Sequence, residues 1–392
     1  MTVLSLPISS HATAPAGLAS ASPRIGSIDA LRGFVMLVMM VDHVREFFYF
    51  HAQVPDPMDA ATTPPALFFT RLAAHVCAPV FVALTGLSAY LYGRKAGRRA
   101  TSAFLVKRGL FLIALELTLV SFGWNFTLTP PTIFLQVIWA IGLSMLALAA
   151  LIHLPRLVLV IFAVTIMLGH NLLDPIAFAA GEPGHALWAV LHDRGFIDLP
   201  WDMRIRTSYP LLPWIGVIAI GYAIGPWFAI DRARRQRRLL LAGGTMLALF
   251  LILRTVNLYG EPLPWSVGTS PLRTLMSFLN LTKYPPSADF LLLMLGCGTL
   301  LLVGFERLPQ RWSGLIAVFG AAPLFYYLLH LYLLHILHVG AVAVAGQDGH
   351  YSLPGVASLW LLTALLAFPL WYACRWFGAV KRRSGQWWMR YL

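Results

Sequence analysis

The stretch that decides the fold is residues 27–46, SIDALRGFVMLVMMVDHVRE. Its apolar middle part belongs to a run long enough to cross a bilayer as a helix, with Asp29 and Arg32 at one end and Asp42 and His43 at the other. Ionisable groups at membrane depth are costly, which makes them functional candidates. At about 100° and 1.5 Å per residue, Arg32 and His43 lie about 20° apart around the helix and about 16 Å apart along it. The sequence therefore predicts a polar path along one stripe of this helix.

The composition of the whole chain indicates an integral membrane protein. Of the 392 residues, 58% are apolar and only 11% are charged, whereas soluble domains carry about 25% charged residues. Because the apolar runs have the length of membrane-spanning helices rather than barrel strands, we expect an all-α, polytopic helical membrane protein with about ten transmembrane helices. The expected spans are residues 28–50, 67–92, 103–122, 133–152, 156–174, 209–230, 239–257, 287–305, 314–338 and 354–377.

The net charge of +13 is informative through its placement. Lys and Arg gather in the loops of one side, at Arg94, Lys95, Arg98, Arg99, Arg156, Arg232, Arg234, Arg235, Arg237, Arg238, Arg307, Arg311, Arg375, Lys381, Arg382, Arg383 and Arg390. The opposite loops hold only Arg194, Arg204, Arg206, Arg273 and Lys283. By the positive-inside rule the basic side is cytoplasmic, as are both termini. The charges therefore report topology, and no nucleic-acid partner is expected.

The same topology predicts the organisation of the chain. Residues 1–25 form a disordered cytoplasmic tail rich in Ser, Ala and Pro, residues 26–378 form the transmembrane domain, and residues 379–392 form a basic cytoplasmic tail. Of the loops on the far side, those at 123–132 and 339–353 are expected to be short, whereas three others are longer. Within one of the longer loops, residues 271–282 have the pattern of an amphipathic helix at the interface.

Two interpretations apply to the charged pair at the cytoplasmic end of the first span. Asp29 and Arg32 are one turn apart and could simply form an ion pair that holds the helix end. A guanidinium at this position could also bind a phosphate or pyrophosphate group arriving from the cytosol.

The groups at the outer end of the same span suggest proton transfer or nucleophilic chemistry. The imidazole of His43 can take a proton from a hydroxyl or amine, or accept an acyl group itself. Asp42 is adjacent, and Glu46, one turn further on, is the better-placed carboxylate. His51 returns to nearly the same stripe, and His75 in the second span could share the pocket. The alternative is a proton relay or a structural polar cluster.

No metal is expected at these histidines. No two of His43, His51 and His75 have the spacing of four residues found in HExxH zinc sites. The cysteines Cys77, Cys297 and Cys374 lie far apart in apolar runs, as buried small hydrophobic residues do.

Other polar and aromatic residues inside the spans are candidates to line a binding cavity. Interhelical hydrogen bonding or aromatic packing would also explain each of them. The candidates to bind a substrate in such a cavity are Arg71, His75, Gln136, Tyr209, Tyr326 and His330.

At these residues the sequence resembles the heparan-alpha-glucosaminide N-acetyltransferase-like family, within the superfamily of transmembrane acyltransferases. The resemblance covers nearly all of residues 26–340 and follows the order of several motifs. They are Ile28–Phe34, Asp42–Arg45, Cys77–Phe81 with Thr85–Gly86, Lys107–Leu110, Phe134–Gln136, Tyr209–Trp214 and Pro323–Tyr327.

The resemblance implies a function and two candidate catalytic histidines. Related acyltransferases carry an Arg, ten residues and then a His on the first span, as Arg32 and His43 do. In the lysosomal enzyme the catalytic His follows an aromatic run that residues 47–51, FFYFH, resemble, and an Asn stands where His43 stands here. Membership implies a cytosolic acyl-CoA donor and an acceptor sugar on the other side, with the donor near Asp29, Arg32, Lys107 and Arg108.

The sequence thus predicts a membrane acyltransferase that moves an acetyl (acyl) group from cytosolic acetyl-CoA to an extracytoplasmic sugar or glycan. His43 is the preferred base, assisted by Asp42 or Glu46 and by His51 or His75. The expected location is the bacterial cytoplasmic membrane, the lipid bilayer is one partner, and a homo-oligomer remains open. The alternatives are a proton-coupled transporter or channel that uses the same stripe, and an inactive membrane scaffold.

Overall fold

The structure is a computed structural model that describes residues 25–49, 58–200, 202–347, 349–384, 386 and 389. His51 and nearly all of the predicted N-terminal tail lie outside the described residues. So does most of the chain after Ser384.

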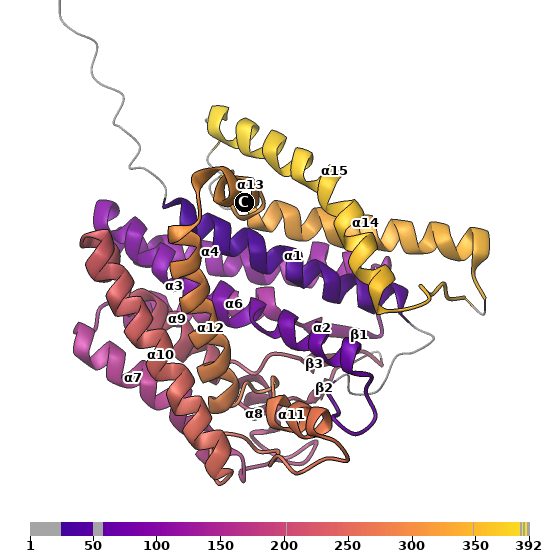
Figure 1. The fold of residues 1–392 in the computed structure, drawn as a ribbon, viewed down its shortest axis with the longest axis horizontal. Coiled ribbons are helices and arrows are strands. Elements are labelled where there is room, and N and C mark those ends of the chain that lie inside the picture. Colours follow the sequence, from indigo (N-terminus) through magenta and orange to yellow (C-terminus); the bar gives the residue numbers. More distant parts are fainter. Residues whose placement is uncertain are drawn as a thin grey trace, which may run out of the picture.

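Most of the described chain is helical (Figure 1). The α-helices are α1 (Gly26–Phe48), α2 (Pro65–His75), α3 (Cys77–Ala96), α4 (Arg98–Leu115), α5 (Ser121–Asn125), α6 (Val137–Leu151), α7 (Arg156–Gly169), α8 (His185–Leu191), α9 (Leu212–Ala223), α10 (Arg232–Val256), α11 (Pro271–Leu279), α12 (Ala288–Arg307), α13 (Gln310–Gly320), α14 (Pro323–Ala345) and α15 (Val356–Arg383). Short π and 3₁₀ segments continue three of them: η2 (Glu116–Val120), η3 (His170–Leu173) and η4 (Gly225–Ala229).

Seven helical segments of the described chain are long and apolar enough to cross a membrane. The predicted class, a polytopic helical membrane protein, is therefore confirmed, while the count of ten and the orientation stay predictions. The helix α1 is not among the seven, and its sequence carries Asp29, Arg32, Asp42, Arg45 and Glu46. The segments are Pro65–Ala96, Arg156–Leu173, Leu212–Ala229, Arg232–Val256, Ala288–Arg307, Pro323–Ala345 and Val356–Arg383.

The helix α1 lies in the middle of the fold (Figure 1) and packs against α2, α3 and α12 to α15. Its closest neighbour is α13, which it meets through two glycines. A Cβ atom on Gly33 would lie 2.0 Å from the carbonyl oxygen of Ile316, and one on Gly320 would lie 1.9 Å from that of Asp29. The two backbones touch because neither glycine carries a side chain, as in other close contacts between membrane helices.

The ninth expected span was wrong in its bounds. Instead of one helix over residues 314–338, the structure has α13 and α14, separated at Ala321 and Ala322. Pro323 is the first residue of α14, a position where proline's missing N–H costs no hydrogen bond. The loop expected at residues 339–353 therefore begins later than predicted, because α14 continues to Ala345.

A three-stranded sheet that the sequence analysis did not predict covers one end of the helices. The strand β3 (Arg204–Thr207) pairs in parallel with β1 (Thr132–Leu135) and antiparallel with β2 (Phe196–Asp198). Because residues 132–135 are extended, the fourth expected span begins as a helix only at Val137.

An amphipathic helix is present within residues 271–282, as predicted, and is α11; its place at a membrane interface stays a prediction. The side chain of Ser270 accepts a hydrogen bond from the backbone N–H of Arg273 and caps its N-terminus. The helix contacts α2 and lies on the side of the molecule where the long loops gather (Figure 1).

Candidate functional site

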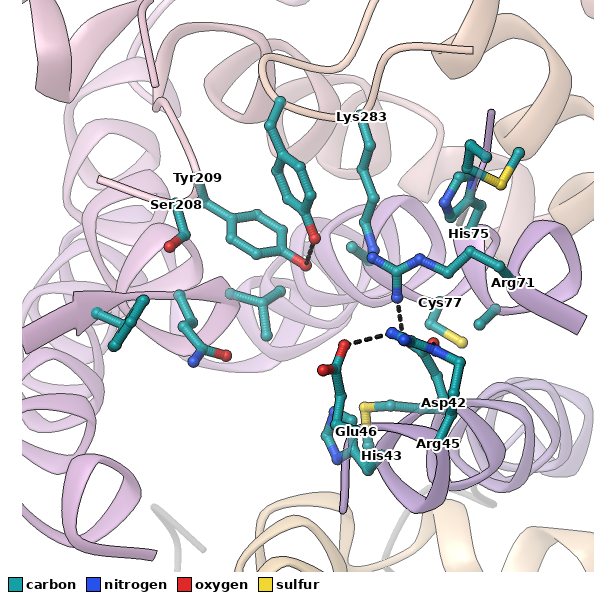
Figure 2. A pocket seen from close by; sticks show the side chains of 18 of the residues that line it. Asp42, His43, Arg45, Glu46, Arg71, His75, Cys77, Ser208, Tyr209 and Lys283 are labelled. Atoms are coloured by element: carbon teal, nitrogen blue, oxygen red, sulfur yellow. Dashed lines mark hydrogen bonds and ion pairs between the residues drawn. The ribbon is translucent and has the colours of Figure 1, made fainter. Parts of the chain in front are cut away.

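A cavity of about 730 Å³ lies at the end of α1 that carries His43; we call it the His43 cavity. Its volume is typical of a small-molecule site. The walls come from the last two turns of α1, the α2–α3 corner, the start of α6 and the loop before α12 (Figure 2). The predicted site residues that line it are Asp42, His43, Glu46, Arg71, His75, Gln136 and Tyr209.

Two arginines enclose the carboxylate of Asp42. The Nε of Arg45 donates to Oδ1 at 3.1 Å, and Nη1 of Arg71 donates to Oδ2. Arg45 also donates to Glu46, so both acidic residues pair with cations rather than with His43 (Figure 2). A buried charge is tolerated when it is paired and hydrogen-bonded. Asp42 therefore fixes two guanidinium groups at the cavity wall.

The partner of His43 is a second histidine, His330 on α14. The Nδ1 of His43 lies 2.8 Å from Nε2 of His330, and Nδ1 of His330 lies 2.8 Å from the carbonyl oxygen of Tyr326. A carbonyl oxygen can only accept, so Nδ1 of His330 carries the proton of that neutral ring and its Nε2 is an acceptor. His43 then donates through Nδ1, which leaves the lone pair on Nε2 of His43 available to a substrate.

Two sequence-predicted residues stand behind the cavity instead of lining it. His330 is fully buried and touches the site through His43. Tyr326 is also fully buried, and its hydroxyl lies 3.1 Å from the sulfur of Met40. Both pack among the helices beneath the site.

The loops supply lining residues that sequence reasoning did not select for the site. Lys283 reaches in from the loop before α12 towards Arg71 (Figure 2). Its Nζ lies 5.2 Å from the ring centre of Tyr284, and the guanidinium of Arg194 lies 4.9 Å from the same ring. The hydroxyl of Tyr284 donates to that of Tyr209 at 3.4 Å. The local signal in the sequence is that Lys283 and Tyr284 are adjacent in a long polar loop. The sequence does not indicate which cavity this loop reaches.

The ionisation of Tyr284 is set by these cations. Burial acts to raise the pKa of its phenol, but the positive charges of Lys283 and Arg71 outweigh burial and lower the pKa to about 8. The cavity thus holds a phenol that ionises in the mildly alkaline range.

A second cavity, of about 840 Å³, lies at the opposite end of α1; we call it the Arg32 cavity. The Nη1 of Arg32 donates to Asp29 at 3.0 Å, and Nη2 donates to the hydroxyl of Ser88 on α3. Of the predicted donor-binding residues, Asp29, Arg32 and Arg108 line this cavity, whereas Lys107 is exposed and does not. Further cations in the wall are Arg94, Lys95 and Lys381.

One side chain, Phe81 on α3, lines both cavities. Cys77 and Ala78, one turn before it, face the His43 cavity, and Thr85 and Ser88, further along, face the Arg32 cavity. Phe81 therefore stands between the two cavities at a point where α3 passes alongside α1.

The fold and these cavities define a class: an integral, multi-pass helical membrane protein with a buried histidine and cation site. More specifically, the chain belongs to the family described as heparan-alpha-glucosaminide N-acetyltransferase, catalytic, which matches residues 24–257. This is a family of membrane acetyltransferases. No curated protein matches the chain. The matched range contains α1 to α4, which carry Arg32, His43 and Phe81, and ends before Lys283 and His330.

Proposed function

We propose that the protein transfers an acyl group, preferably acetyl, from acyl-CoA in the Arg32 cavity to a sugar or glycan in the His43 cavity. The observation that carries this proposal is that the two cavities lie at opposite ends of α1 and share Phe81 as a wall. The family match supports acetyl transfer as the chemistry. The loop charges favour a cytosolic Arg32 cavity, in a bacterial cytoplasmic membrane.

On the donor side, the cations of the Arg32 cavity would bind the phosphates of CoA. A guanidinium offers two parallel N–H donors to a phosphate, which gives both affinity and orientation. Asp29 is itself an acceptor and would repel phosphate, so we assign it to holding Arg32 in place. The binding set is Arg32, Arg94, Lys95, Arg108 and Lys381.

On the acceptor side, the ring faces and polar groups of the His43 cavity suit a sugar. Trp124 and Tyr284 offer aromatic surfaces, and Gln136 and Tyr209 offer hydrogen-bonding groups. The cations Arg194 and Lys283 lie at the same wall.

The reaction is a proton-coupled acyl transfer. The acceptor's nitrogen or oxygen forms a bond to the carbonyl carbon of the thioester, and the C–S bond breaks. His43 takes the acceptor's proton on Nε2 and passes it to the CoA thiolate, so that CoA leaves as the thiol. His330 fixes the tautomer of His43 and stabilises the imidazolium that forms. The residues of the cavity thus supply a base, its support and a polar wall.

The test is acetyl transfer in proteoliposomes with radiolabelled acetyl-CoA and a panel of amino and neutral sugars. We expect His43→Ala and His43→Gln to lower kcat by about 10²- to 10⁴-fold, the usual contribution of a general base. His153→Ala is the matched control, because His153 is exposed on a turn and lines neither cavity. Activity should require donor and acceptor on opposite faces of the membrane.

Two outcomes would overturn the proposal. The first is transfer at the wild-type rate in both His43 variants. The second is uptake of a solute or of protons with no acetyl-CoA consumed, which would indicate a transporter that uses the same path. Labelling of the wild-type protein by acetyl-CoA without acceptor, absent in His43→Ala, would indicate a covalent acyl-histidine intermediate instead of general-base catalysis by His43.

A further inference from the structure

A cluster of two histidines and a carboxylate lies outside both cavities, at the end of α7. His170 begins η3, Asp174 directly follows it, and His192 directly follows α8. One ligand atom from each of the three residues lies within 4.8 Å of the other two. His170 and Asp174 are four residues apart, His192 lies 18 residues beyond Asp174, and neither cavity includes any of the three.

Within the described chain, the polar atoms that lie close to the ring nitrogens of His192 are all acceptors. Its Nδ1 lies 3.2 Å from a carboxylate oxygen of Asp193. Its Nε2 lies 3.0 Å from the backbone carbonyl oxygen of His170 and 3.4 Å from Oδ1 of Asp174. A neutral imidazole carries only one N–H, so one of its nitrogens would face oxygen lone pairs without a proton. A cation at that nitrogen, either a second proton or a metal ion, removes the conflict.

His170 distinguishes the metal from the proton. Its side chain is 2% exposed, and neither ring nitrogen makes a hydrogen bond of normal length and angle within the described chain. The carbonyl of Pro286 faces the ring on one side. A buried polar group without a partner is costly, and a proton on His192 would leave His170 unsatisfied. A metal ion bound by both rings satisfies both.

We propose that His170, His192 and Asp174 bind a divalent transition-metal ion, with zinc as the best match. Imidazole nitrogen and carboxylate oxygen are ligands that zinc accepts at bonds of about 2.0–2.2 Å. A tetrahedral ion with such bonds holds its ligands roughly 3.4 Å apart, a separation that His192 Nε2 and Asp174 Oδ1 already have. The other pairs of ligand atoms, within 4.8 Å of one another, need to close only slightly on binding. The fourth position is open to water, because the Asp174 side chain is 29% exposed.

The residues around the cluster have the arrangement that supports metal ligands. Asp193 accepts from Nδ1 of His192, which leaves Nε2 unprotonated for the ion. Asn171 donates to Oδ2 of Asp174 at 2.9 Å, which leaves Oδ1 for the ion. The ring of Trp188 stacks on that of His192 at 5.0 Å and holds its plane.

The ion would brace the loops that form the His43 cavity. Asn171 also accepts a hydrogen bond from the backbone N–H of Ala288 at the start of α12. Arg194 follows His192 by two residues, and Tyr284 precedes Pro286 by two. Both line the cavity. The proposed role is structural and does not depend on acyl transfer.

The test is the zinc content of the purified protein. The protein is purified through an affinity tag that contains no histidine, so that the tag itself binds no zinc. After loading with Zn²⁺ and gel filtration, we expect about one zinc per chain in the wild type by elemental analysis. We expect a loss of at least about tenfold in His170→Gln and His192→Gln. The matched control is His185→Gln, since His185 is a half-buried histidine at the start of α8 whose nitrogens bond to the carbonyls of Phe178 and Phe196.

A second measurement guards against misfolded variants. Asp193→Asn keeps all three ligands and should weaken Zn²⁺ retention by about 10- to 100-fold while the protein stays monodisperse. Co²⁺ loading should give the visible absorption of a tetrahedral site in the wild type, and His170→Gln should remove it. Wild-type protein that retains no more Zn²⁺ than folded His170→Gln would overturn the proposal and leave a proton as the cation at His192. So would equal loss in His185→Gln.

Discussion

The Nδ1 atom of His43 lies 2.8 Å from Nε2 of His330, although the two histidines are 287 residues apart in the sequence. Through His330 the imidazole of His43 is connected to a backbone carbonyl of α14, which cannot change its role as an acceptor. The orientation and the tautomer of His43 therefore depend on α14, a helix that the family match does not reach.

This relationship predicts a graded effect of substitutions at His330. His330→Ala removes the acceptor for Nδ1 of His43 and should lower kcat by about 10²- to 10³-fold, with a smaller change in KM for acetyl-CoA. His330→Gln offers an amide oxygen in its place and should recover part of the rate. Steady-state kinetics and pH profiles of both variants provide the check. Equal rates for the Ala and Gln variants would argue against a positioning role.

A second prediction concerns Arg32 and the donor. Arg32→Ala removes a charged donor from the Arg32 cavity, and a hydrogen bond to a charged group contributes about 1.5–3 kcal/mol. We therefore expect KM for acetyl-CoA to rise by about 10- to 100-fold, and binding of labelled acetyl-CoA to weaken in parallel. Lys107→Ala is the control, because Lys107 is exposed and lines neither cavity. An effect of the same size in Lys107→Ala would instead indicate general surface electrostatics.

A third prediction concerns Phe81. Phe81→Ala should open the wall between the cavities and allow acetyl-CoA hydrolysis without acceptor, and Phe81→Trp should slow transfer. Thiol release and product formation, measured separately, distinguish the two effects. Phe368→Ala is a suitable control, since that side chain is 69% exposed on α15. Tight coupling of thiol release to product in Phe81→Ala would contradict the proposed wall.

A fourth prediction follows from Tyr284. Since its pKa is lowered to about 8 by Lys283 and Arg71, the phenol should be neutral below that pH and ionised above it. The phenolate is no longer a donor to Tyr209, so we expect KM for the acceptor to rise as the pH increases through about 8. Tyr284→Phe should remove this alkaline limb. Near-UV absorbance of tyrosinate gives an independent readout. The wild type should show the ionisation of one tyrosine near pH 8, and Tyr284→Phe should lack it.

A fifth prediction tests the contact between α1 and α13. Gly320→Ala would place a methyl group 1.9 Å from the carbonyl oxygen of Asp29, and forcing atoms into a packed interface costs about 1–3 kcal/mol. Thermal unfolding in detergent should shift to lower temperature. Gly244→Ala on α10 is the matched control, because a Cβ atom there meets nothing within 4 Å. The control should be neutral or slightly stabilising, since alanine favours a helix over glycine.

The sequence was sufficient for what depends on local pattern. Apolar length predicted the helical class and the approximate positions of most spans, and helical spacing placed Arg32 and His43 at opposite ends of α1. The break between α13 and α14 was missed because Ala321 and Ala322 lie inside a continuous apolar run, where hydropathy gives no boundary. Only the close approach of Gly320 to α1 and the proline after it mark the turn.

What could not be predicted depends on contacts between distant segments. Nothing local indicates that His330 supports His43, or that Lys283 and Arg194 reach the same cavity. The sheet was missed for the same reason, since three α-helices, α6, α7 and α8, separate β1 from β3 along the chain. Carboxylates near His43 in the sequence were expected to tune it, but Arg45 and Arg71 take both of them.

The glycine contact between α1 and α13 also bears on how a large donor could enter. Gly320, Ala321 and Pro323 line the Arg32 cavity together with α1 residues, so this side of the cavity is held by backbone contact between α1 and α13. The opposite side consists of α3 and α4, joined at Gly97 in the left-handed region with φ of +82° and open space around it. If the proposed acyl-CoA donor enters here, we expect the α3–α4 corner to move, with Gly97 as its hinge.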